Sequence, residues 1–72
     1  MSGMKIHAPF AGIVRYHVAP GQQVAAGDTL ATVEAIKLEA SVPAPGPGTV
    51  GEVFRADFSD VLGGDELLEL GQ

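Results

Sequence analysis

The chain has 72 residues, which suffices for one domain but not for a large core with a catalytic cleft beside it. It contains no cysteine, which excludes a disulfide framework and thiolate metal sites, and no metal site is predicted. Nine acidic residues against four basic ones make it acidic, which argues against nucleic-acid binding because the phosphate backbone is also negative.

The chain in order begins with a segment that carries no apolar block of the kind found in signal peptides. No later apolar run approaches the roughly 20 residues of a membrane-spanning helix. We therefore predict a cytoplasmic protein that does not bind membranes. Residues 1–72 should form a single domain in which residues 1–4 are flexible.

Short apolar runs separated by glycine and proline follow, a pattern typical of an all-β sandwich or barrel. The pattern also repeats: APFAG at residues 8–12 is echoed by APGPG at residues 44–48, and after one inserted residue the echo continues to residue 67. Two similar units of this kind can bury their apolar faces against each other. The identical pairs are Ala8/Ala44, Pro9/Pro45, Gly12/Gly48, Val14/Val50, Val24/Val61, Gly27/Gly64, Asp28/Asp65 and Leu30/Leu67.

Each half predicts the same series of elements. A strand (residues 13–18 or 49–54) leads through a glycine turn to a short strand near Val24 or Val61. A Gly-Asp turn and an apolar strand (30–33 or 67–70) complete the half. The two halves should form two small antiparallel sheets that face each other. The predicted interior is Val14, Val18, Val24, Val33, Val50, Val61 and Leu68.

The segment from Thr29 to Ala40 is ambiguous by local pattern alone. It is rich in good helix formers, and Ala31, Ala35 and Leu38 fall on one helical stripe. Its β-branched residues favour a strand instead. Its counterpart in the repeat, residues 66–70, is too short for a helix, so we predict two strands joined by a tight turn at residues 36–37. That turn lacks the Asn-Gly chemistry that hairpins prefer, which suggests that its residues serve another purpose.

The pentapeptide EAIKL at residues 34–38 resembles the Glu-Ala-Met-Lys-Met signature of biotinyl domains. The surroundings agree with the family pattern, because Gly27 precedes Lys37 by ten residues and Gly48 follows it by eleven. The resemblance covers about residues 5–70. The chain departs from the signature at both methionines, where it has Ile36 and Leu38.

The resemblance implies a flattened β-barrel or sandwich of two four-stranded antiparallel sheets with a pseudo-two-fold repeat, the barrel-sandwich hybrid. Lys37 would lie at an exposed hairpin tip and carry biotin in amide linkage. The chain would then be a non-catalytic biotin carboxyl carrier. Its partners would be a biotin protein ligase and the biotin carboxylase and carboxyltransferase of an acyl-CoA carboxylase. The resemblance also implies that these partners would recognise Glu34, Ala35, Ile36 and Leu38, and less strongly Glu39.

Other interpretations remain open. A lipoyl carrier of a 2-oxoacid dehydrogenase complex shares the fold, although such domains typically have Asp-Lys-Ala at the tip. An unmodified barrel-sandwich interaction module is a third possibility, in which Lys37 is an ordinary surface lysine. Lys5 is a weak second candidate for modification. His7 and His17 have no catalytic partners in sequence and are predicted to be structural or surface residues.

Overall fold

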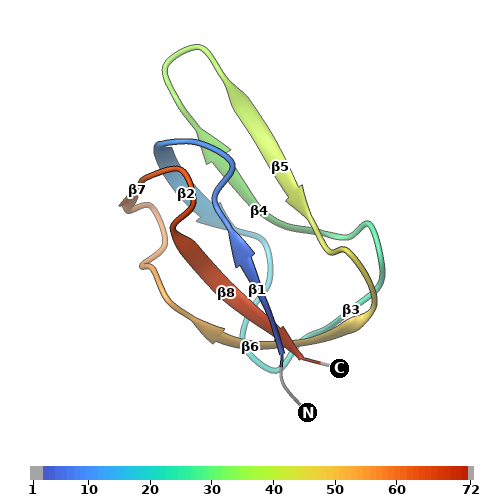
Figure 1. Ribbon diagram of the computed structural model, residues 1–72. Coiled ribbons are helices and arrows are strands. Elements are labelled where there is room, and N and C mark those ends of the chain that lie inside the picture. The colour runs from blue at the N-terminus through green and yellow to red at the C-terminus, as the bar shows by residue number, and fades with distance from the viewer. Residues whose placement is uncertain (1–2, 72) are drawn as a thin grey trace.

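The computed structural model describes residues 3–71, which contain eight strands and no helix (Figure 1). The predicted all-β class is confirmed, and the helical alternative for residues 29–40 is wrong for this chain. The strands are β1 (Met4–His7), β2 (Gly12–Tyr16), β3 (Gln23–Val24), β4 (Thr29–Glu34), β5 (Glu39–Pro43), β6 (Gly48–Val53), β7 (Asp60–Val61) and β8 (Glu66–Gly71).

The strands form two four-stranded sheets in the orders β1-β8-β6-β3 and β5-β4-β2-β7, and every pairing is antiparallel. In the repeat, strands β1 to β4 of the first half correspond to strands β5 to β8 of the second half. Replacing each strand of one sheet by its counterpart gives the strand order of the other sheet. Each sheet therefore combines strands from both halves of the repeat. Because the two halves contribute strands to both sheets, they together form the pseudo-two-fold sandwich that the repeat predicts.

The repeated Gly-Asp turns make the same hydrogen bonds in both halves. The Asp28 carboxylate accepts from the amide of Ala25 at 2.9 Å, and the amide of Gly27 donates to the carbonyl of Ala44 at 2.8 Å. Gly27 has φ +88°, a backbone conformation that favours glycine. The predicted turn role of both aspartates is confirmed. The equivalent bonds of the second half join Leu62 to Asp65 at 2.9 Å and Gly64 to Ala8 at 2.9 Å.

The core lies between the two sheets and is built almost entirely from aliphatic side chains. Six of the seven residues predicted to lie inside are buried, and Val18 is only partly buried because β2 ends at Tyr16. The strand predicted at residues 13–18 therefore begins and ends earlier than expected. The most completely buried large side chains are Leu30, Leu67, Leu68, Val14, Val33 and Val50.

The imperfect apolar alternation of β6 has a structural cause. Val50 pairs with Leu70 but Val53 pairs with Leu68, so three steps along β6 match two along β8. The extra residue shifts the register, and a one-residue shift exchanges the two faces of a strand. Val53 therefore packs against the core while Glu52 stays exposed.

Strand β1 was not predicted from the sequence as a separate element. Met4 pairs with Leu70 and Lys5 with Glu69, so the structure places Met4 in a sheet where the sequence suggested flexibility through residue 4. Residues 1–2 lie outside the described residues. β1 begins beside the end of β8, at the end of the molecule opposite the β4–β5 hairpin (Figure 1).

Tyr16 links the sheets and makes the fold sensitive to high pH. Its hydroxyl donates to the carbonyl of Leu67 at 3.2 Å, and burial, assisted by the nearby Asp57 carboxylate, raises the pKa of the phenol. The unfolded chain loses this proton near pH 10 while the folded chain retains it. The contribution of Tyr16 to the free energy of unfolding is thus fully present below about pH 10 and declines as the pH rises further.

Urea titrations should show a smaller loss of stability above about pH 10 for Tyr16→Phe than for the wild type, and equal losses would contradict the prediction.

Candidate functional site

The β4–β5 hairpin carries the candidate residues at the end of the molecule. Glu34 pairs with Glu39, and the turn closes with a 2.7 Å hydrogen bond from the amide of Ala35 to the carbonyl of Leu38. Ile36 and Lys37 form the tip, as predicted. Among residues 3–71, Phe58 is the one non-glycine residue with positive φ, so neither tip residue adopts the left-handed conformation of the preferred hairpin turns.

Lys37 lies exposed at this tip. Within residues 3–71, the other three lysine and arginine side chains each form an ion pair: Lys5 with Glu66, Arg15 with Glu39 and Arg55 with Asp65. Lys37 forms none within the same residues. Its amine is therefore open to a reagent that approaches from solvent, whereas Lys5 is held beside Glu66 and the ring of Phe54.

The carboxylates of Glu34 and Glu39 face each other at the base of the hairpin, and their like charges repel. Arg15, on the neighbouring strand β2, reaches across β4 and bonds the Glu39 carboxylate at 3.0 Å. Glu34 stays exposed. This contact involves three strands and was not predicted from the sequence, which assigned Glu39 only a weak part in recognition.

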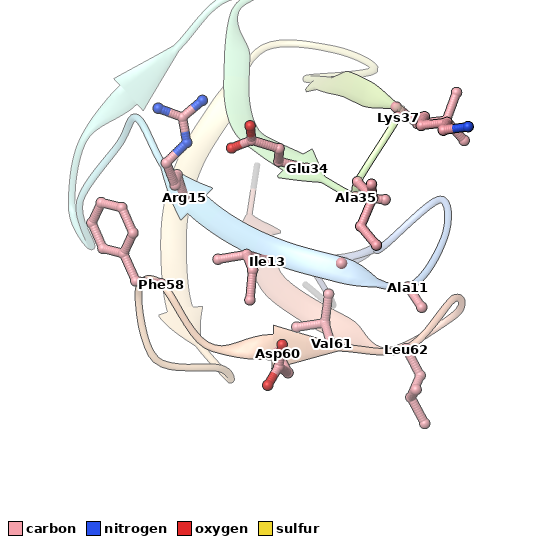
Figure 2. Close-up of a pocket in the computed structure, with 13 residues that line it drawn as sticks. Ala11, Ile13, Arg15, Glu34, Ala35, Lys37, Phe58, Asp60, Val61 and Leu62 are labelled. Atoms are coloured by element: carbon pink, nitrogen blue, oxygen red, sulfur yellow. The ribbon is translucent and has the colours of Figure 1, made fainter.

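A shallow groove runs beside the hairpin over the outer surface of β2 and β7 (Figure 2). It brings together the four tip residues of the predicted recognition set with Lys37 at the edge. Sequence analysis missed the remaining lining residues, which come from strands and loops distant in the chain. They are Ala11, Gly12, Ile13, Arg15, Phe58, Asp60, Val61 and Leu62.

The two histidines occupy different environments. The Nε2 of His17 lies 2.7 Å from the hydroxyl of Thr32, which satisfies a buried polar group, and His7 is exposed on β1. These placements agree with the structural and surface roles predicted for them. In the described part of the chain, no cluster of three side chains suits a metal ion. Residues 3–71 also contain no helix that could cross a membrane.

Comparison of the sequence with known families gives a match over residues 1–70 to the biotin/lipoyl family, described as "Biotin-requiring enzyme". No curated protein sequence matches the chain. The family match thus covers nearly all of the sequence, including both halves of the repeat and the hairpin.

Solved structures with the same fold include two carboxylases. A single-chain, multi-domain long-chain acyl-CoA carboxylase superposes with a TM-score of 0.89 at 26% identity, covering 99% of this chain and 7% of that one. The urea carboxylase of Kluyveromyces lactis gives 0.85 at 25% identity, with 97% of this chain and 6% of that one covered. This chain therefore spans less than a tenth of either carboxylase.

A third similar structure comes from a different class of protein. A succinylglutamate desuccinylase/aspartoacylase family protein of Shewanella amazonensis superposes with a TM-score of 0.84 at 26% identity. The alignment covers 97% of this chain and 20% of that protein. The sandwich alone thus does not determine what a chain does. With the family match over residues 1–70 and the lysine-tipped hairpin between the two repeats, the chain belongs to the biotin/lipoyl attachment family of carrier domains.

Proposed function

We propose that this chain is a biotin carboxyl carrier domain that bears biotin on Lys37. The observation that carries the proposal is the position of Lys37, exposed at the tip of the β4–β5 hairpin and without an ion pair among residues 3–71. An amine in this position can enter the active site of another enzyme without any unfolding of the sandwich. Biotin, rather than lipoate, is favoured by the two apolar neighbours of Lys37 and by the similarity to two carboxylases.

Attachment requires the amine of Lys37 to act as a nucleophile. Its Nζ would bond to the acyl carbon of biotinyl-adenylate, the bond from that carbon to the phosphate oxygen would break, and AMP would leave. The proton released from Nζ passes to solvent or to the ligase. The chain contributes an accessible amine and a rigid hairpin, while the ligase contributes the activated acyl group.

Once attached, biotin would supply a ring nitrogen able to carry a carboxyl group. The domain itself holds the attachment point, and the β4–β5 ladder keeps the tip projecting from the sandwich. The partners follow from this role: a biotin protein ligase, a biotin carboxylase and a carboxyltransferase, which we place together in the cytoplasm. An acyl-CoA carboxylase is the favoured setting because one similar structure is a long-chain acyl-CoA carboxylase.

Two alternative functions compete with this proposal. The family includes lipoyl domains, so Lys37 could carry lipoate for a 2-oxoacid dehydrogenase complex. The same fold occurs in an aspartoacylase family protein, so the second alternative is an unmodified sandwich that serves only in interaction. A lipoyl carrier leaves the exposed isoleucine and leucine on either side of Lys37 without a role, whereas the biotinyl signature has apolar residues at these positions. An interaction module would use these apolar side chains but gives the amine of Lys37 no role.

The identity of the modification can be tested by intact mass after co-expression with either a biotin ligase or a lipoate ligase. We expect one biotinyl group, mapped by peptide analysis to Lys37, with the first enzyme and no addition with the second. A lipoyl group on Lys37 would transfer the function to the lipoyl alternative. An unmodified chain with both active enzymes would support the interaction module.

A carrier is also expected to be inactive by itself. Given ATP, bicarbonate and an acyl-CoA, the biotinylated chain alone should produce no malonyl-type product because it supplies no carboxylating active site. Adding a separate biotin carboxylase should give carboxylation of the attached biotin, measured with radiolabelled bicarbonate. Turnover by the purified chain alone, in preparations free of other carboxylase subunits, would contradict the carrier role.

A further inference from the structure

The pseudo-two-fold repeat provides an internal comparison between two equivalent surfaces. One covers β2, β7 and the 54–59 loop beside the Lys37 hairpin, and the other covers β6, β3 and the 17–22 loop. The pairing is the same in both: Ile13 pairs with Asp60 as Thr49 pairs with Gln23. Differences in side chains between the two surfaces therefore reflect something other than the fold.

The largest difference is at Phe58. Its amide donates to the carbonyl of Val14 at 2.7 Å, as the amide of Gly21 donates to the carbonyl of Val50 at 2.7 Å. Phe58 thus occupies the position of a glycine, and it keeps the glycine conformation, with φ +61° against +88° for Gly21. A bulky residue in this region is strained. The fold itself needs only glycine there, so the phenyl ring is not explained by the turn.

The phenyl ring adds to an apolar surface that the equivalent side of the molecule lacks. Phe58 is 67% exposed, and Leu62 and Ile36, which line the same groove, are 69% and 99% exposed. Ile13, on β2, lies between Phe58 and Leu62 (Figure 2). We call Ile13, Ile36, Phe58 and Leu62 the Phe58 surface. For Ile13, Phe58 and Leu62 the counterparts on the other side are small or polar: Thr49, Gly21 and Ala25.

Acidic groups border the Phe58 surface. Glu34 and Asp60 line the groove and are exposed, while the positive charge of Arg15 is engaged by Glu39. Lys37 supplies the remaining positive charge of the lining, and acylation would remove it. A partner with an apolar contact area and a basic border complements this arrangement.

From these features we infer that the Phe58 surface docks the biotin protein ligase, through an apolar patch bordered by lysine or arginine on the enzyme. This inference rests on the proposed biotin-carrier function. To acylate Lys37, the ligase must bring the acyl carbon of its bound biotinyl-adenylate to about 3–3.5 Å from the Nζ atom of Lys37. A ligase in this position covers the tip of the hairpin, and the Phe58 surface lies directly beside that contact, in the groove that Lys37 borders. Enzymes that act on the ring of an attached biotin are separated from the hairpin by the length of the arm.

The test compares Phe58→Gly with the wild type in steady-state biotinylation, using unmodified chain, biotin, ATP and purified ligase. Glycine is the residue of the equivalent turn, so the melting temperature should not fall. The KM for the chain should rise about tenfold, or about 1.4 kcal/mol of docking energy, with little change in kcat. Leu62→Ala should raise KM in the same way. Thr49→Ala, on the equivalent surface of the other sheet, is the matched control and should leave KM unchanged.

Docking can also be measured without chemistry. The Lys37→Arg chain cannot be acylated but keeps the Phe58 surface, so it should inhibit biotinylation of the wild type competitively. Adding Phe58→Gly to it should raise the inhibition constant about tenfold. Unchanged KM and inhibition constants for the Phe58 and Leu62 variants, with the wild type fully biotinylated, would overturn the docking surface alone. A wild type that no ligase modifies would overturn the proposed function and this inference together.

Discussion

Replacing Lys37 with arginine should abolish biotinylation while leaving the sandwich folded. Arginine keeps the positive charge and similar length, but its guanidinium stays protonated at neutral pH and is a poor nucleophile. Lys37 is exposed and forms no ion pair within residues 3–71, so the free energy of unfolding should change by less than about 0.5 kcal/mol. Avidin blotting and intact mass measure the first effect, and urea titration measures the second.

Lys5→Arg is the matched control because Lys5 is the other lysine of the chain. It lies in β1, away from the hairpin, and its ion pair with Glu66 can be formed equally by arginine. Full biotinylation is expected for this variant. If avidin binding persisted in Lys37→Arg and disappeared in Lys5→Arg, the attachment site would have to be moved to β1.

The second large effect is predicted at Gly12, where β2 passes close to the base of the hairpin. A Cβ atom at this position would lie 2.5 Å from the carbonyl oxygen of Glu34 and 3.1 Å from the side chain of Val33. The obstacle is backbone in a paired strand, so β2 and β4 would have to separate. We expect Gly12→Ala to destabilise the fold by about 3 kcal/mol. For a domain of this size that corresponds to a fall of roughly 10–20 °C in melting temperature.

Gly46→Ala provides the comparison for this prediction. A Cβ atom at Gly46 would meet no atom within 4 Å, and its φ is not positive. Its melting temperature should therefore stay within a few degrees of the wild type, or rise slightly because alanine restricts the unfolded chain. Equal melting temperatures for the Gly12 and Gly46 variants would show that the close approach of β2 and β4 is not required.

The sequence was sufficient to predict those features that depend on local chemistry repeated along the chain. The two Gly-Asp turns and the strand character of residues 29–40 follow from the repeat, and the exposed tip at Lys37 follows from the resemblance to biotinyl domains. Turn conformation depends on residues within a few positions of each other, so it can be inferred without a structure. The predicted interior rests on the same apolar pattern, and of its seven residues only Val18 was misassigned, because it lies beyond the end of β2.

Features that join distant segments were decided only by the tertiary structure. The pairing of β1 with β8 places the first and last strands of the chain side by side, and Arg15 reaches Glu39 across an intervening strand. Phe58 could have been noticed opposite Gly21 in the aligned repeat, but its exposure and its place beside Ile13 could not. Such contacts depend on which strands become neighbours and on which face each side chain takes. One added residue, as in β6, reverses that face, and periodicity alone does not locate it.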